Sequence, residues 1–494
     1  MKDRSPGRRD DETAILDTAA AGVLAIRGGA IRLLTYLVGV AATVASAALL
    51  FRHLGVGDSG RYVLVLSLVT LTAGLTDAGL STLGVRELAL RGGEDRHHFV
   101  RNLLGLRAAF SLVGALVACA YAVVAGYGGT LVLGTALAGL GVVVQNLQGT
   151  LATSLQAELR LGWVSLADLL RQLVTVLGIV GLVLLGASLL PFFVVGVIAG
   201  AAALVMTAVL VRRAMPFAPA FESLRWIQLL RETLPFALAV AVAALYFRVA
   251  ILLVDLVSSS TQTGYFGVSF RIVEVLVVIP QLVIGAGFPI VARAARDDAD
   301  HLRYGLQKML DASLLLGALI AVGLGVGAPV AINLLAGREF EPAVPVLQWH
   351  ALALVFSFAA AVFGYGLLSL SRHRAILAMT TAALLTSVTG VLVLASLEGA
   401  AGAAAATAAA ELVLVLSGWL LLARGQGGLR LELRSIPRLA LAAAVAVVPA
   451  FLLPAGLAAV AALLIFGAAA HVLGAVPDEL LVEARSALSR IRRS

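Results

Sequence analysis

The sequence carries few charged residues, a single cysteine and only two lysines. Asp, Glu, Lys and Arg make up 13% of its 494 residues, whereas a soluble globular chain carries about 25%. One cysteine, Cys119, excludes an internal disulfide framework and a cysteine-based metal site. The sequence contains no G-x-x-x-x-G-K-[ST] motif, so we expect no ATP hydrolysis. We also expect no cofactor and no bound metal.

Hydrophobic residues, in contrast, make up 61% of the chain, and its mean hydropathy is +1.01. Many apolar windows exceed the roughly 20 residues that a helix needs to cross about 30 Å of hydrocarbon. The Ala and Leu runs lack the two-residue alternation of a membrane-spanning barrel. This pattern predicts an all-α polytopic membrane protein.

About 14 of these windows are candidate transmembrane helices. We place them at residues 29–52, 61–83, 102–126, 128–153, 164–186, 189–211, 233–256, 265–291, 310–336, 343–369, 374–395, 402–423, 437–454 and 456–474. The N-terminal segment is too polar and too long to be a cleaved signal peptide, so we expect the first span to be retained.

Basic residues between the spans predict the topology, because cytoplasmic segments are enriched in Lys and Arg. The N-terminus, the even-numbered connections and the C-terminus hold 28 of the 36 basic residues. Both termini should therefore be cytoplasmic. The net charge of +8 then reflects this topology and contact with anionic lipid headgroups, and no nucleic-acid partner is needed to explain it.

The two halves of the chain resemble each other weakly, as in transporters built from two related lobes. Gly60 with Tyr62 and Gly264 with Tyr265 begin corresponding spans, each after a short polar connection. We expect two pseudo-symmetric six-helix lobes plus two C-terminal helices. The predicted segments are a cytoplasmic tail (1–28), an N-lobe (29–211), an amphipathic interfacial linker helix (212–232), a C-lobe (233–423), two further spans (424–474) and a second cytoplasmic tail (475–494).

Several motifs resemble those of the polysaccharide or oligosaccharide flippases, a family of the multidrug/oligosaccharidyl-lipid/polysaccharide exporter superfamily. The resemblance covers about residues 25–425 and rests on Leu54-Gly55, Gly60, Tyr62, Asp77, Gly79, Arg86-Glu87 and the strings "LYFRVAILLVDL", "TGYFGVSFRIVEVLVVIP" and "EGAAGAAAATAAAELV". It implies a V-shaped bundle in a bacterial cytoplasmic membrane that moves a polyprenyl-pyrophosphate-linked glycan outward by alternating access. Glycan polymerases or glycosyltransferases are possible partners, and we expect a monomer.

Charged residues inside the apolar spans are the candidate site residues, because an unpaired charge at mid-membrane is costly. Arg248 and Arg271 are candidates for binding the pyrophosphate, since a guanidinium binds phosphate oxygens in a bidentate fashion. Glu274 would hold Arg271 until an anionic headgroup replaces it. The alternative is a structural i, i+3 pair between Arg271 and Glu274. Asp255, seven residues after Arg248 on the same helix face, is a further cleft candidate.

Three other charged residues have weaker cases. Arg32 could assist in binding the pyrophosphate, or could only anchor the first span at the cytoplasmic surface. Asp77 is either a helix-packing group or a coupling candidate. Glu411, within an Ala-rich span, is either a protonated, hydrogen-bonded side chain or a proton-coupling carboxylate.

Three other functions are weighed against the flippase prediction. An ion-coupled multidrug antiporter needs acids in its cleft, but the first span offers only Arg32. A membrane glycan polymerase usually has a large external loop, which this chain lacks. A glycosyltransferase needs a metal-holding acid pair, and Asp298 and Asp300 have that spacing only within the charge run "RDDAD".

Overall fold

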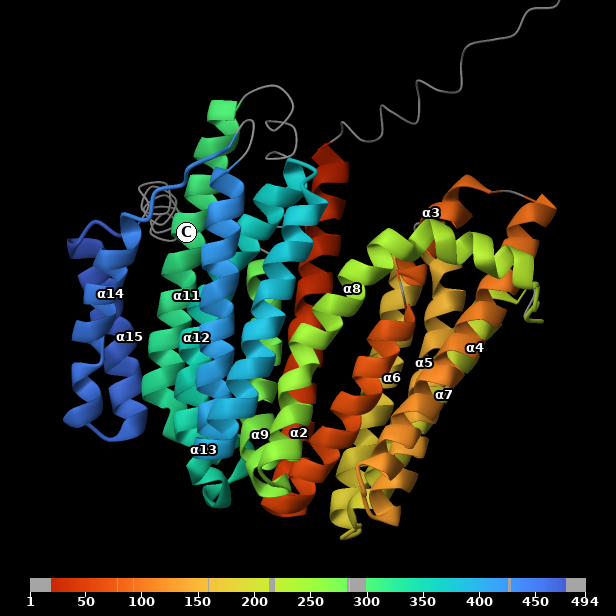
Figure 1. The fold of residues 1–494 in the computed structure, drawn as a ribbon, viewed down its shortest axis with the longest axis horizontal. Coiled ribbons are helices and arrows are strands. Elements are labelled where there is room, and N and C mark those ends of the chain that lie inside the picture. Colours follow the sequence, from red (N-terminus) through yellow and green to blue (C-terminus); the bar gives the residue numbers. More distant parts are fainter. Residues whose placement is uncertain are drawn as a thin grey trace, which may run out of the picture.

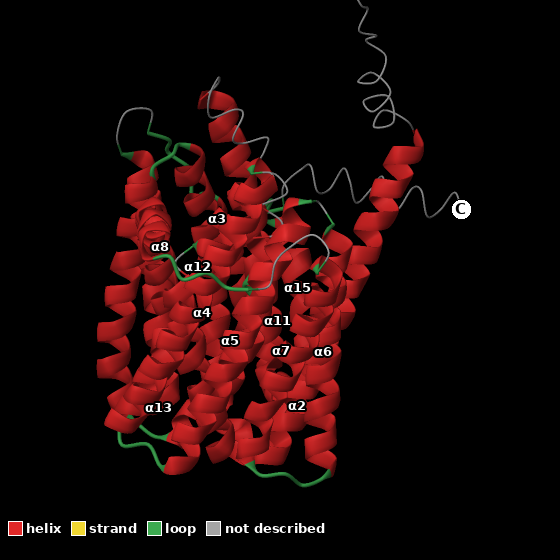
Figure 2. Cartoon of the chain, turned by 90° about the vertical axis from the view of Figure 1, so that its right-hand side faces the viewer, coloured by secondary structure: helices red, strands yellow, loops and turns green. Residues whose placement is uncertain are grey.

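The computed structural model describes residues 19–77, 79–91, 93–158, 160–212, 218–281, 284, 299–424 and 428–476. These ranges are largely helical and contain no strand (Figure 2). Within them, eleven helices are long and apolar enough to cross a membrane, and residues Ser435–Phe451 form a shorter apolar segment. The chain is therefore an all-α, multi-pass membrane protein, which confirms the prediction.

Figure 1 shows how the helices are arranged in the bundle. Their bounds are α2 Ala19–Asp77, α3 Leu80–Leu90, α4 Gly93–Val124, α5 Gly129–Ala157, α6 Leu161–Leu184, α7 Leu189–Val211, α8 Ser223–Val257, α9 Ser260–Leu276, α11 Ala299–Ala336, η1 Arg338–Ala343, α12 Val344–Ser369, α13 His373–Ala423, α14 Ser435–Ala446, η2 Val448–Phe451 and α15 Ala455–Val472.

Two of these labels, α2 and α13, each cover two helices that are joined at a sharp kink. Each of the two pairs contains two of the predicted spans. Gly55 (φ 67°, ψ −176°) interrupts α2, and Gly399 (φ 61°, ψ −134°) interrupts α13. Only glycine adopts such backbone angles readily, so a single residue is enough to break the helix. The segments predicted to be loops, 53–60 and 397–399, are therefore helical, and each is interrupted at a single glycine. We call the side of the bundle that carries both glycines the Gly55 end.

The bundle has two lobes, which Figure 1 shows side by side. Helices α3 to α7 form the first lobe, α9 and α11 to α13 form most of the second, and α2 and α8 lie between them. Helices α14 and α15 pack against α11 at the edge of the second lobe. The predicted linker is not a separate element, because its residues from Ser223 onward continue into the seventh span as α8.

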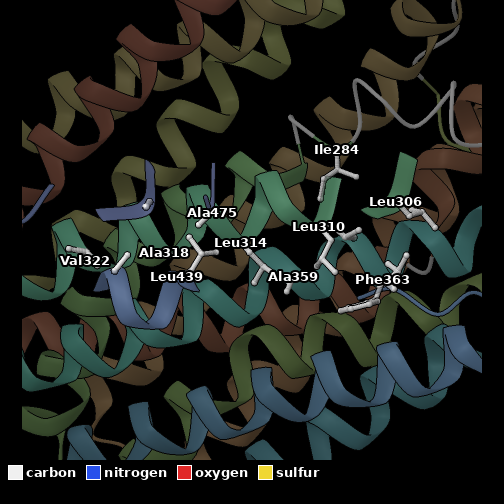
Figure 3. Close-up of a cluster of buried hydrophobic side chains, with 14 of the residues drawn as sticks. Ile284, Leu306, Leu310, Leu314, Ala318, Val322, Ala359, Phe363, Leu439 and Ala475 are labelled. Carbon is white, nitrogen blue, oxygen red and sulfur yellow. The ribbon is translucent and has the colours of Figure 1, made fainter. Parts of the chain in front are cut away.

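Small and aliphatic side chains fill the interior of the second lobe (Figure 3). Leu310, Leu314 and Phe363 join α11 to α12, while Leu439 and Ala475 bring the C-terminal segment onto the same cluster. Because lipid is as apolar as these side chains, close packing rather than removal from water holds membrane helices together. This cluster therefore fixes α14 and α15 to the lobe.

The two lobes touch at the Gly55 end. There α2 crosses α9 so closely that a Cβ on Gly60 would lie 1.9 Å from the Ser260 carbonyl oxygen, and one on Gly264 would lie 2.4 Å from the Val56 carbonyl oxygen. These two glycines begin the corresponding spans of the predicted repeat. Only residues without a side chain permit this approach.

A second contact between α2 and the second lobe surrounds the end of α11. Arg52 Nη2 donates to the carbonyl oxygens of Asn333 and Leu334, each at 2.9 Å. The rings of Phe51 and Phe340 lie 6.3 Å apart. The Asn333 carbonyl oxygen also accepts from the Gly337 backbone N–H at 3.0 Å. Arg52 thus adds a charged donor to carbonyls in the last turn of α11, where helical partners run out.

Candidate functional site

A cavity of about 140 Å³ lies between the lobes. Four helices from both halves of the chain form its walls, namely α2, α6, α8 and α9. It is lined by Thr43, Ser46, Ala47, Leu50, Phe51, Tyr62, Val63, Leu66, Ser67, Gln172, Thr175, Val176, Ile179, Arg248, Gly267, Phe270, Arg271 and Glu274. We call it the interlobe cavity.

Three charged side chains meet in the interlobe cavity. Arg248 Nη2 pairs with Glu274 Oε1, and Arg271 Nη1 pairs with Glu274 Oε2 at 2.7 Å. The side chains of Arg248 and Glu274 are 19% and 22% exposed, and that of Arg271 is 37% exposed. One carboxylate thus neutralises one of two guanidinium groups, and the cluster keeps a net positive charge.

Aromatic rings hold Arg248 in place. Its guanidinium carbon lies 5.4 Å from the centre of the Phe247 ring and 5.6 Å from that of Phe270, distances at which a cation is attracted to a ring face. Arg271 has no such contact among the described residues and is the more exposed of the two arginines. An incoming anion could therefore reach Arg271 more easily than Arg248.

The structure adds a wall that the sequence analysis missed. Helix α6 contributes Gln172, whose Nε2 donates to the Gly39 carbonyl oxygen and to Thr43 Oγ1 on α2. Thr175 lies on the same helix and also lines the cavity. An amide within the apolar run "RQLVTVL" was the available signal for this wall.

Of the other predicted residues, Asp77 is not part of this cluster. Asp77 instead pairs with the buried Arg107 on α4 and accepts a hydrogen bond from Ser81 Oγ at 2.6 Å. This pairing joins the end of α2 to α4 of the first lobe. Arg32 belongs to α2, but its side chain lies outside the described residues; along the helix it is roughly 16 Å from Thr43 at 1.5 Å per residue.

Asp255 connects the lobes rather than neutralising Arg248. Its carboxylate accepts hydrogen bonds from the Tyr127 hydroxyl at 2.8 Å and from Thr263 Oγ1 at 3.4 Å. Tyr127 lies in the turn between α4 and α5. Burial and the nearby Asp255 charge raise the pKa of the Tyr127 hydroxyl above its usual range, so it remains a donor.

Glu411 lies in a second cavity, of about 530 Å³, inside the second lobe. Its Oε1 accepts a hydrogen bond from the Tyr246 hydroxyl at 2.7 Å. Tyr246 and Arg248 are two residues apart on α8, and they contact Glu411 and Glu274 respectively. We call this space the C-lobe cavity.

The described residues contain no group of three His, Cys, Asp or Glu side chains that could hold a metal ion. In the "RDDAD" run, Asp298 lies outside the described residues, and Asp300 belongs to the first turn of α11. The chemistry that the interlobe cavity supports is therefore that of its two guanidinium groups, which suit a phosphate or another oxyanion.

A family model described as "Polysaccharide biosynthesis protein" matches residues 49–345, which is more than half of the chain. The matched segment contains Arg248, Arg271 and Glu274. No curated protein sequence matches the chain.

Several solved transporter structures share the fold. An inward-closed structure of the lipid II flippase MurJ has a TM-score of 0.71 at 13% identity and covers 88% of this chain and 97% of its own. An inward-facing multidrug resistance MATE family transporter of the MOP superfamily has a TM-score of 0.64 at 13% identity. The match covers 76% of this chain and 93% of the transporter. A MOP superfamily transporter from Pyrococcus furiosus has a TM-score of 0.56 at 13% identity. The match covers 78% of this chain and 92% of the transporter. The chain thus has the two-lobed fold of this superfamily, as its resemblance to the family implied.

Proposed function

We propose that this chain, which belongs to the polysaccharide biosynthesis protein family, moves a polyprenyl-pyrophosphate-linked oligosaccharide across a bacterial cytoplasmic membrane. The observation that carries the proposal is the pair of arginines that share Glu274 in the interlobe cavity. A cationic cluster within the membrane favours an anionic cargo over a cationic one. The MurJ structure, of a lipid II flippase, supports the same class of cargo by its likeness.

The proposed binding step is an exchange of partners. A pyrophosphate enters the cavity, displaces Glu274 from Arg271 first, and accepts hydrogen bonds from Arg271 and then Arg248. The aromatic contacts of Arg248 keep its guanidinium oriented during this exchange. Arg32 would assist from further along α2. The glycan would occupy space that opens between the lobes, because about 140 Å³ suffices only for the headgroup.

Alternating access would carry the bound headgroup across the membrane while the prenyl tail stays in lipid. With both termini in the cytoplasm, the Gly55 end faces outward and its interlobe contacts close the outer side. Glu411 is the proposed coupling carboxylate, because its Oε2 is buried without a hydrogen-bond partner among the described residues. Glycan polymerases or glycosyltransferases are proposed partners of a monomeric transporter.

The test is transport of a fluorescent polyprenyl-pyrophosphate sugar in proteoliposomes, measured by loss of fluorescence to an impermeant quencher. Arg271→Ala and Arg248→Ala should each weaken lipid binding by roughly tenfold or more, since hydrogen bonds to charged groups contribute about 1.5–3 kcal/mol. Both variants should slow flipping.

Arg61→Ala is the matched control, because the one ion pair of Arg61 with a described residue is an exposed pair with Asp58 at 3.0 Å. Unchanged transport in both cavity variants, or equal transport of organic cations by the wild-type protein, would contradict the proposal.

A further inference from the structure

We propose that the C-lobe cavity is a second binding site, for a lipophilic organic monocation, with Glu411 as its counter-ion. This site is distinct from the interlobe cavity, where the proposed ligand is an anion. Helix α8 lies between the two cavities. Its Tyr246 lines the C-lobe cavity, and its Arg248 lines the interlobe cavity. Phe270 lines both cavities.

The charge of the C-lobe cavity defines the sign of the ligand. Glu411 is the only Asp, Glu, Lys or Arg side chain among the described residues that line it. The Tyr246 hydroxyl satisfies Oε1, whereas the buried Oε2 has no hydrogen-bond partner among the described residues. A buried carboxylate with an unsatisfied oxygen is costly, and an ammonium or iminium group of a ligand would supply the missing donor and charge.

The aromatic walls define the rest of the ligand. Phe247, Phe266, Phe270 and Tyr365 line the cavity. The His350 ring lies 4.9 Å from the Phe266 ring, and its Nδ1 is 2.6 Å from Ser269 Oγ. Apart from the faces of Phe247 and Phe270 that lie against Arg248, such rings attract an organic cation by their faces and bury its apolar parts.

The size of the cavity suits an organic ligand better than an inorganic ion alone. A volume of about 530 Å³ lies in the 300–1,000 Å³ range of sites for small organic molecules. The lining extends along α12 from His350 to Leu368, and includes His373 at the start of α13. At 1.5 Å per residue this is roughly 27 Å along α12, so the site is elongated and extends toward the end opposite to Gly55.

Ethidium is a suitable probe, because it is a permanent aromatic monocation that fluoresces more strongly when it leaves water. We expect saturable binding to the purified full-length protein in detergent. Glu411→Gln should raise its Kd by about tenfold or more, as expected when one partner of a buried charge pair is lost. Glu94→Gln, at an exposed acid in the first turn of α4, is the matched control.

A steric variant keeps the proposal testable if Glu411→Gln unfolds. A Cβ on Gly364 would meet only Met379 Cε, at 4.0 Å, so the first side-chain atom of Gly364→Leu fits without a clash at a position that lines the cavity. It should raise the ethidium Kd to a similar degree. Gly181→Leu is the control, since Gly181 has no neighbour within 4 Å of a built Cβ and does not line the cavity.

Several results would overturn the proposal. One is the absence of saturable ethidium binding to the wild-type protein. Another is the same Kd in Glu411→Gln and Gly364→Leu as in their controls. Equal binding of the uncharged heterocycle phenanthridine would show that the site has no preference for cations. Thermal stabilisation by Na⁺ that requires Glu411, without any effect of ethidium, would identify an inorganic ion site instead.

Discussion

At the scale of single residues, Glu274 controls the charge of the interlobe cavity. It accepts from Arg248 and Arg271 at once, so its removal leaves two cations without a carboxylate. Breaking a buried ion pair is costly because the remaining charge stays desolvated. The partial exposure of Arg271 reduces this cost, since solvent screens its charge.

Glu274→Gln should therefore lower the free energy of unfolding by about 1–3 kcal/mol and increase the affinity for inorganic pyrophosphate. Thermal unfolding in detergent, with and without pyrophosphate, measures both effects. Pyrophosphate should stabilise Glu274→Gln more than wild type, whereas Glu94→Gln should behave as wild type. Equal stabilisation of all three proteins would mean that the cavity does not bind this anion.

The same scale shows what sequence reasoning can predict about the site. Arg248, Arg271 and Glu274 are recognisable because their neighbours along the chain are apolar, and an i, i+3 pair needs only helical spacing. The contact of Arg248 with Glu274 joins two helices and has no local signal. Asp77 likewise pairs with Arg107, thirty residues away, where sequence spacing carries no information on contact.

At the scale of helices, apolar windows predict membrane spans well because every residue of a span meets lipid or protein. They predict helix ends less well, because a helix continues into water wherever hydrogen bonds allow. Helix α8 therefore starts in the predicted linker, and α2 stays helical up to and beyond Gly55. The crossing of α2 and α9 depends on Gly60 and Gly264, which mark the repeat in the sequence.

Gly60→Ala should separate these two helices, because the added Cβ would overlap the Ser260 carbonyl oxygen, a backbone atom that no rotamer change can move. We expect a loss of about 1–3 kcal/mol in stability, measured as a lower thermal unfolding midpoint. Gly57→Ala provides the control in the same segment, since a Cβ at Gly57 meets nothing within 4 Å. Similar midpoints for the two variants would rule out a tight crossing.

At the scale of the whole molecule, the contacts at the Gly55 end hold the lobes together on one side. One contact is the hydrogen bond from Tyr127, in the first lobe, to Asp255 on α8. The other is the pair of hydrogen bonds from Arg52, on α2, to the carbonyl oxygens of Asn333 and Leu334 in the second lobe. These contacts must break for the interlobe cavity to open toward the Gly55 end.

Cysteine labelling tests this closure. In a Cys119→Ala background, Thr175→Cys places a thiol in the interlobe cavity, and an impermeant thiol reagent added at the Gly55 end should label it slowly. Adding Arg52→Ala and Tyr127→Phe should speed labelling by roughly tenfold or more, since each lost hydrogen bond contributes about 1 kcal/mol. Arg61→Ala should leave the rate unchanged; an equal rate in all backgrounds would show that these contacts do not close the cavity.

The close crossing at Gly60 and Gly264 also has a mechanical consequence. Because backbone touches backbone at Gly60 and Gly264, this is the point where α2 and α9 approach most closely and resist separation, so it can serve as the fulcrum of a lever. A rotation of about 10° at this fulcrum would displace the opposite helix ends by about 5 Å across roughly 30 Å of hydrocarbon. The Gly55 end would move little while the far end opens, and the stroke is set by the length of the helices.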